Sequence, residues 1–145
     1  MSLLAEPPVL AVDPGRKKCG VAVVDPQRGA LWHQVVMTAD LLPMIMNLAP
    51  RFGCRSLILG DQTFSSTLRE ALQPLLDQAV LQEILLIDER GSTEEARSRY
   101  WEAEPPTGWR RFIPLGLLFP PCAIDDFAAI ILGERYFKKI VKKKL

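Results

Sequence analysis

The sequence predicts an α/β fold in which helices flank a mixed five-stranded sheet, with three antiparallel strands followed by two parallel ones. The first observation is a series of three apolar runs near the N-terminus, separated by turns too short to hold a helix. The second is a change after residue 40, where short apolar runs alternate with segments of helical periodicity. Short turns connect antiparallel neighbours, whereas helical crossovers connect parallel strands. At 145 residues with 48% hydrophobic content, the chain fits one domain, residues 1–145.

The three N-terminal runs form the antiparallel part. Val9–Asp13 is apolar on both alternating faces up to its final acid, a pattern typical of a strand that is covered on both sides and central in its sheet. Pro14 and the glycine after it end this run, a second run opens at Gly20, and residues 31–37 form the third. Asp-Pro-Gly is also ordinary turn chemistry, so Asp13 either begins a turn or ligates a metal.

The rest of the chain alternates helices with strands. Helical periodicity covers residues 40–52, 65–80, 92–104 and 124–137, and strand-like apolar runs cover residues 56–59 and 84–87. Pro74 is expected to kink the second of these helices. The letters STEE from Ser92 match a capping box, which predicts a helix start at that serine. Two prolines stop this helix, and residues 107–121 are expected to be irregular.

Acids follow three strands that the topology places side by side. Asp13 ends the first strand, Asp61 follows the fourth, and Asp88 and Glu89 follow the fifth. The run before Asp88 is apolar on both faces, so alternation does not choose between Asp88 and Glu89. Neighbouring carboxylates repel one another without a cation, and Mg²⁺ takes oxygen ligands. The pattern therefore predicts a metal site at this edge of the sheet.

The last helix adds a further acid. At about 100° per residue, Asp125 lies in line with Ala128 and Leu132 and is aimed back at the sheet, whereas Asp126 points almost opposite. The small residues Ala128 and Ala129 allow close approach of this helix to the strands. Both acids also suit the positive end of a helix dipole, which is the alternative explanation. Combined with the strand-end acids, Asp125 is the expected ligand.

Charge restricts nucleic-acid binding to local patches, because the net charge is only +1. Arg16, Lys17 and Lys18 follow Asp13 and form either an anion-binding turn or a solvated one. The final eight residues hold five lysines, which form either a solvated helix end or a phosphate contact.

The cysteines and the single histidine exclude several other classes of site. Cys19, Cys54 and Cys122 are widely spaced, which argues for reduced thiols in a cytoplasmic protein and against a zinc site or a disulfide framework. His33 has no second histidine to act with and is expected to be structural. No apolar stretch reaches about 18 residues, so we expect no membrane partner.

Three stretches carry a family resemblance: VDPGRKKCGVAVVD, LLIDERGSTEEA and IDDFAAIILGERY. In this order and spacing they resemble the signatures of the YqgF/RuvX family of Holliday junction resolvases and pre-16S rRNA-processing nucleases. The resemblance spans roughly residues 9–137. It implies an RNase H-like nuclease domain that hydrolyses nucleic-acid phosphodiester bonds with a metal ion. Asp13 matches the acid of the first strand, Glu89 lies in the DER motif, and Asp125 matches the acid of D-x-x-A-A.

The resemblance and the residue pattern together assign the site. We expect Mg²⁺ or Mn²⁺ as the cofactor, structured RNA or branched DNA as the partner, and a monomer or homodimer as the working unit. No side chain need act as the nucleophile. The expected catalytic residues and metal ligands are Asp13, Glu89 and Asp125, and the expected substrate-binding residues are Arg16, Lys17, Lys18 and Arg90.

Two segments depart from the family pattern. Members carry Gly-Leu-Pro where this chain has Gly60 and Asp61, so Asp61 either joins the metal cluster or, as we favour, caps a helix near Thr63. Members also carry a basic run before the last acid, where this chain has Phe-Pro-Pro-Cys. There are two alternatives for residues 107–121. Either Arg110 and Arg111 replace the missing basic run while Trp109 stacks on bases, or Trp109 and Phe112 pack under their loop.

Two other functions share parts of this pattern. The acidic turn between two strands resembles the phosphate-binding hairpin of actin-like ATPases and sugar kinases, but those enzymes close two such domains around a nucleotide. The second alternative is a non-catalytic nucleic-acid or protein interaction module that keeps the fold with a degraded site.

Overall fold

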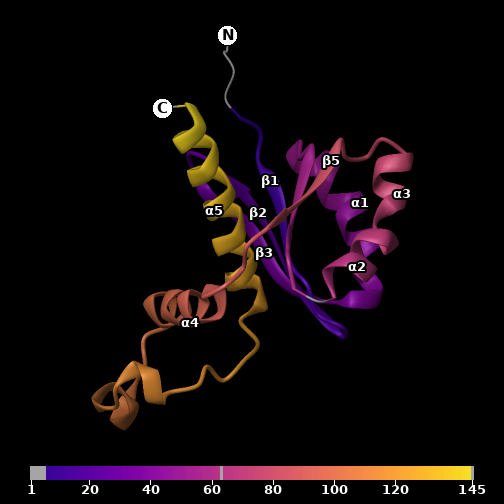
Figure 1. Ribbon diagram of the computed structural model, residues 1–145. Helices are drawn as coiled ribbons and strands as arrows, with labels where there is room; N and C mark the ends of the chain where they lie inside the picture. Colours follow the sequence, from indigo (N-terminus) through magenta and orange to yellow (C-terminus); the bar gives the residue numbers. More distant parts are fainter. Residues whose placement is uncertain (1–5, 63, 145) are drawn as a thin grey trace.

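The sheet of this protein is mixed and has the strand order β3-β2-β1-β4-β5. The structure is a computed structural model that describes residues 6–62 and 64–144, with side chains described up to residue 139. Strands β1 (Val9–Asp13), β2 (Lys18–Asp25) and β3 (Gly29–Met37) are antiparallel, and β4 (Ser56–Gly60) and β5 (Glu83–Ile87) are added parallel to β1 (Figure 1). The predicted α/β fold is therefore confirmed.

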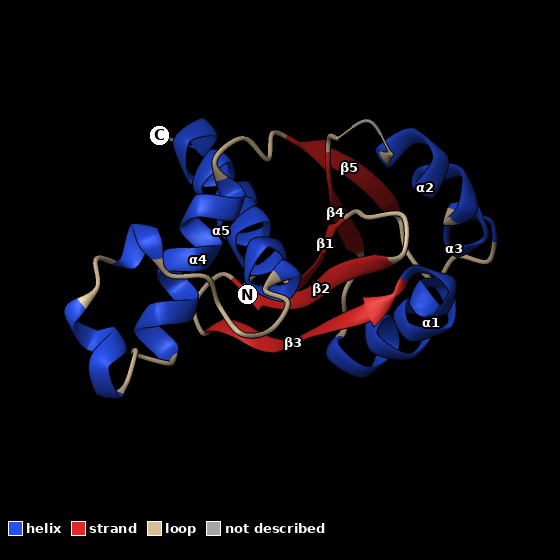
Figure 2. Ribbon diagram, turned by 90° about the horizontal axis from the view of Figure 1, so that it is seen from below, coloured by secondary structure: helices blue, strands red, loops and turns tan. Residues whose placement is uncertain are grey.

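Helices cover both faces of the sheet. Short helices precede or follow the main ones: η1 (Thr38–Asp40), η2 (Gly108–Phe112) and η3 (Leu115–Leu117). The main helices are α1 (Leu41–Phe52), α2 (Ser65–Ala71), α3 (Gln73–Asp77), α4 (Ser92–Ala103) and α5 (Asp125–Lys144). Figure 2 shows α1, α2 and α3 on one side of the sheet and α5 with α4 on the other. Among the described residues, no helix has both the length and the apolar character needed to cross a bilayer.

The two faces of the sheet are packed with residues of different size. The face toward α1, α2 and α3 buries mainly large side chains, among them Leu10, Leu57, Leu59, Ile45, Leu48, Leu72 and Leu75. The face toward α5 contains Ala11 and Ala22 on the strands and Ala129 on the helix, all fully buried. A methyl group added at Gly133 of α5 would press against Val24 of β2. Small residues therefore bring α5 close to the central strands, as its alanines predicted.

Two helix predictions differ from the structure in detail. The segment 65–80 forms two helices, because Pro74 lies in the first turn of α3, where a proline without an N–H is tolerated. The predicted capping box is wrong. Gly91, at φ +76°, is the N-cap of α4, and Ser92 is already inside the helix and buried. The reason is the tight exit from β5, in which the Ser92 N–H donates to the Glu89 carbonyl at 3.0 Å and the left-handed position favours glycine.

The last helix is longer than predicted and runs to Lys144. Lys138 and Lys139 are exposed, which fits a solvated helix end. The side chains of the three following lysines lie outside the described ones.

Candidate active site

Asp13 lies at the end of the most central strand. It pairs with Gly20 of β2, while β4 runs parallel on the other side of β1. The four apolar residues before it are fully buried or nearly so, and the Asp13 carboxylate is half-buried. The buried strand therefore holds this carboxylate at the edge of the sheet where β4 and β5 also end.

Glu89 reaches the same edge from the end of β5. Its side chain is only 6% exposed, and its carboxylate lies over Gly60, so that a methyl group at Gly60 would collide with it. No described residue donates a well-formed hydrogen bond to either Glu89 oxygen. Buried carboxylates in proteins normally have such partners, so these two oxygens are free to accept one from outside the described residues.

Burial and mutual contact shift the pKa values of Asp13 and Glu89. Burial, then a hydrogen bond to Glu89 and the charges of Glu89 and Asp125, raise the pKa of Asp13 to about 8. Burial also raises the pKa of Glu89, while its interactions with Asp13 and with the backbone of Gln62 oppose that shift. The two carboxyl groups therefore lie against each other, and burial together with their mutual repulsion favours the protonated form of Asp13.

Asp125 approaches this pair from the first turn of α5. Its backbone carbonyl lies directly against Gly20, where any side chain would collide with it. Burial raises the pKa of Asp125, and the positive charge of Lys18 partly offsets this. Gly20 thus lets α5 begin beside Asp13, and we call Asp13, Glu89 and Asp125 the acid edge.

The donor set at the acid edge suits a hard divalent cation. Asp13 and Glu89 offer neighbouring carboxylate oxygens that are largely withdrawn from solvent, and such hard oxygen ligands are the kind that Mg²⁺ binds. The three acids do not surround one point: within the described part of the chain, no three His, Cys, Asp or Glu side chains form a group that could hold an ion. The fit therefore rests on the Asp13 and Glu89 pair, with Asp125 as its neighbour.

The two acids left open by the sequence lie at the periphery. The Asp88 carboxylate is turned to solvent and accepts the Arg90 backbone N–H at 3.0 Å, so Glu89 is the one that meets Asp13. Asp61 is exposed and accepts the Glu89 backbone N–H at 3.4 Å. The predicted cap at Thr63 lies outside the described residues, and the N-cap of α2 is Phe64 with no side-chain cap. Asp61 therefore supports the backbone of Glu89 instead of capping a helix.

The basic turn beside Asp13 is braced and solvent-facing. Thr38 donates its N–H to the Lys17 carbonyl and its hydroxyl to the Gly15 carbonyl, both at 2.8 Å. Arg16, Lys17 and Lys18 are exposed, and none of them forms an ion pair with a described residue. Three exposed cations on a turn held by these hydrogen bonds can accept phosphate groups.

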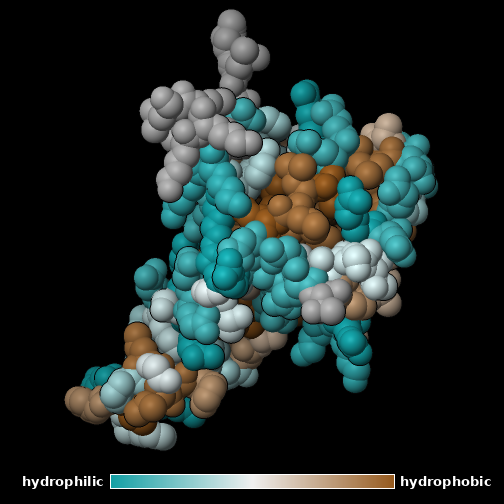
Figure 3. All heavy atoms as spheres, viewed as in Figure 1, coloured by the Kyte–Doolittle hydropathy of each residue, from teal (hydrophilic) through white to brown (hydrophobic). Residues whose placement is uncertain are grey.

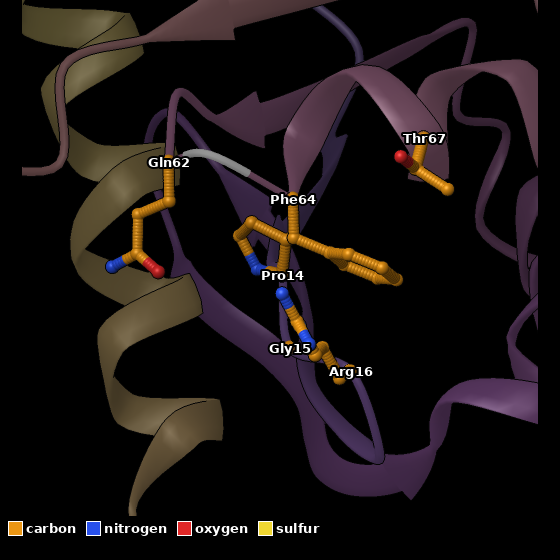
Figure 4. Close-up of a pocket in the computed structure, with 6 residues that line it drawn as sticks. All are labelled: Pro14, Gly15, Arg16, Gln62, Phe64 and Thr67. Atoms are coloured by element: carbon orange, nitrogen blue, oxygen red, sulfur yellow. The ribbon is translucent and has the colours of Figure 1, made fainter.

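A cleft of about 540 Å³ separates this turn from the start of α2. Figure 4 shows Arg16 on the turn side of the cleft and Gln62 and Phe64 on the other. Arg90, the fourth predicted substrate contact, is exposed and 3.4 Å from Asp88. Its side chain is 92% exposed, and it does not line the cleft beside the basic turn.

Sequence reasoning missed one polar pair and two glycines. Asp126 does not point away from the sheet: its carboxylate is 2.8 Å from Nδ1 of His33 on β3, and its side chain is 13% exposed. This bond ties the first turn of α5 to β3. Gly20 and Gly60 make room for α5 and Glu89, and glycine inside a strand is the signal that would have pointed to such close approach.

Solved structures share this fold. RuvC of T. thermophilus, in complex with a Holliday junction substrate, matches with a TM-score of 0.58 and 16% identity over 94% of this chain and 96% of that one. Another structure of RuvC from Thermus thermophilus matches with a TM-score of 0.57 and 13% identity over 92% and 96% of the two chains. No family model and no curated protein matches the sequence. At this identity the likeness shows the fold alone, which is RNase H-like.

Proposed function

We propose that this protein is a metal-dependent endonuclease that hydrolyses phosphodiester bonds in branched or structured nucleic acid. The observation that carries the proposal is the contact between half-buried Asp13 and buried Glu89, beside a braced turn that carries three exposed cations. Acids that need a cation and cations that need an anion are the two halves of a phosphodiester-cleaving site.

Asp13, Glu89 and Asp125 would hold one or two Mg²⁺ or Mn²⁺ ions. The bound ion supplies activation of water and stabilisation of the leaving oxygen, so no side chain acts as a nucleophile. Arg16, Lys17 and Lys18 bind the phosphates beside the scissile bond. The Asp61 carboxylate acts through the Glu89 backbone and is a positioning residue.

The finer assignment is to the YqgF/RuvX family. Its support is the three sequence signatures, together with a fold shared with a RuvC that is bound to a Holliday junction substrate. A four-way DNA junction is therefore the first substrate to test and a precursor of 16S rRNA the second. A monomer or a homodimer is the proposed working unit.

The test is a cleavage panel of four-way junction, rRNA precursor, single-stranded RNA and plain duplex, with Mn²⁺, with Mg²⁺ and with chelator. Wild-type protein should cut at least one branched or structured substrate only when the metal is present. Asp13→Asn should reduce the rate by a factor of about 1,000 or more, because the ion loses a charged ligand. Asp40→Asn, at an exposed acid on η1, is the matched control and should cut like the wild type.

Binding without cleavage by the wild-type protein on every substrate would contradict the nuclease proposal. That result would favour the non-catalytic interaction module. Equal rates for Asp13→Asn and wild type would remove the acid edge from the mechanism.

A further inference from the structure

Residues 105–123, which we call the arm, carry aromatic side chains that face the solvent. The arm connects α4 to α5 and projects from the end of α4 away from the sheet in both Figure 1 and Figure 2. Trp109 is 69% exposed and Phe112 is 78% exposed, so the expectation that they pack under the loop is wrong. The brown patch at the lower left of Figure 3 is this part of the surface. Exposed rings of this size on a protruding segment indicate a binding surface.

The arm is anchored at its base. Leu118 is buried against Tyr100 and Trp101 of α4, with Ile113 packed on the same cluster. Phe119 is 77% exposed, with the Arg97 guanidinium 5.6 Å from Cζ to its ring centroid, so it belongs to the exposed rings of the arm and not to the anchor. The exposed rings therefore sit on a segment held to α4, and removing them leaves this anchor intact.

Charge identifies the kind of partner. The sequence from residue 105 to residue 124 contains no acid and two arginines, Arg110 and Arg111. Arg110 lies over the Trp109 ring at 5.8 Å, and Arg111 lies over the Phe112 ring at 5.0 Å. Each exposed ring thus carries its own cation. A flat ring beside a cation matches a base beside its phosphate, and an acid-free surface matches a polyanion.

The arm also lies next to the acid edge in the chain. It begins after α4, whose first residue is three positions beyond Glu89, and it ends two residues before Asp125. In Figure 1 it projects from the end of the molecule at which α5 begins. On its C-terminal side the arm therefore joins the first turn of α5, which carries Asp125, whereas on its N-terminal side α4 separates it from Glu89.

We propose that the arm stacks Trp109 and Phe112 on unpaired bases of the nucleic acid held at the acid edge, with Arg110 and Arg111 on the neighbouring phosphates. This proposal rests on the proposed function and adds the substrate feature that the site selects. Bases inside a continuous duplex have both faces covered by their neighbours. The arm therefore selects substrates with open bases near the cut, such as branch points and single-stranded ends.

The test measures binding in chelator, so that it does not depend on cleavage. The probes are a labelled duplex with a single-stranded tail and a labelled, fully paired duplex of the same length. Binding of the protein to each probe is measured by fluorescence anisotropy. The double variant Trp109→Ala with Phe112→Ala should bind the tailed probe at least tenfold more weakly and the paired duplex within twofold of wild type. Trp109→Phe with Phe112→Tyr keeps both rings and should restore binding to the tailed probe.

Leu117→Ala is the matched control, because Leu117 is apolar, 71% exposed and on the same arm, but has no ring. It should leave both affinities unchanged. An equal loss on both probes, an equal loss in Leu117→Ala, or no binding by the wild type would overturn the proposal. A fall in self-association of the double variant without a change in nucleic-acid affinity would also overturn it and make the arm a contact between two copies of the chain.

The two proposals fail separately. If the rings discriminate between the two probes but no substrate in the panel is cleaved, the nuclease proposal is wrong and the proposal for the arm stands. If cleavage depends on Asp13 but Trp109 and Phe112 do not discriminate between the tailed and the paired probe, the proposal for the arm is wrong and the nuclease proposal stands.

Discussion

The acid edge and the arm are neighbours in the chain but are made of opposite kinds of residue. The acid edge consists of buried or half-buried carboxylates packed against glycines, and an added methyl at Gly20 or Gly60 would collide with it. The arm consists of exposed rings and arginines without an acid, and an added methyl at Gly116 meets nothing within 4 Å. Chemistry on a phosphodiester needs fixed distances, whereas contact with varied bases needs exposed, sequence-tolerant surface.

The largest contrast should come from adding one methyl group to each region. Gly20→Ala would force α5 away from β2, because its Cβ would overlap the Asp125 carbonyl, and we expect a loss of about 3 kcal/mol or more in the free energy of unfolding. Gly116→Ala on the arm should change it by less than about 0.5 kcal/mol. Urea unfolding of the two variants measures both values. Similar losses would mean that the arm is packed as tightly as the acid edge.

The acid edge should also respond to pH in the metal-free protein. The pKa of Asp13 is raised to about 8, so the folded state binds this proton more tightly than the unfolded chain does. Its contribution to stability is therefore complete below about pH 4 and is lost as the pH rises toward 8. Asp13→Asn should melt several degrees above wild type at about pH 8.5 in chelator and close to it at about pH 4.

Adding Mn²⁺ gives the complementary result for the same pair of proteins. At the same alkaline pH the ion should raise the melting temperature of the wild type, because it relieves the repulsion between Asp13 and Glu89. It should have little effect on Asp13→Asn, which lacks the charged ligand. Equal stabilisation of both proteins by Mn²⁺ would place the ion elsewhere. Asp40→Asn is the control for loss of an exposed charge.

Salt dependence should separate the basic turn from the arm. Replacing Arg16, Lys17 and Lys18 with alanine should lower the slope of log affinity against log salt by roughly 0.9 for each phosphate that the turn no longer neutralises. Removing the rings of Trp109 and Phe112 should leave that slope unchanged, because stacking releases no counterions. Binding titrations between about 50 and 200 mM salt, where phosphate-bound proteins change most in affinity, measure it. A slope unaltered by the triple variant would mean a merely solvated turn.

The smallest expected effect is at Asp61. Asp61→Asn replaces the charged acceptor of the Glu89 backbone N–H with a neutral amide oxygen and should cost about 0.5 kcal/mol in the free energy of unfolding. It also removes a charge that raises the pKa of Glu89, so the acidic limb of the cleavage profile should move to lower pH. Loss of Mn²⁺ affinity at unchanged stability would instead make Asp61 a ligand.

Topology could be predicted from sequence because it depends on periodicity and loop length. The double-sided apolar run of Val9–Asp13 indicates a central strand, and short turns followed by helical segments set the order of the sheet. That order alone brings Asp13 and the end of β5 to one edge. The small residues of the last helix likewise indicate close packing on the strands.

Side-chain direction depended on the tertiary structure. The run before Asp88 is apolar on both alternating faces and so has no phase in the sequence, although Leu86 of the edge strand β5 is 55% exposed. Only the exit of the chain from β5 separates buried Glu89 from exposed Asp88. The direction of Asp126 was also decided by the tertiary structure. Its helical phase points away from the inner face of α5, but His33 of β3 lies close enough to contact its carboxylate. Trp109 looks the same in sequence whether it is packed or exposed. Composition and periodicity determine which elements form and in what order, whereas burial of one side chain is decided by which neighbours arrive from distant parts of the chain.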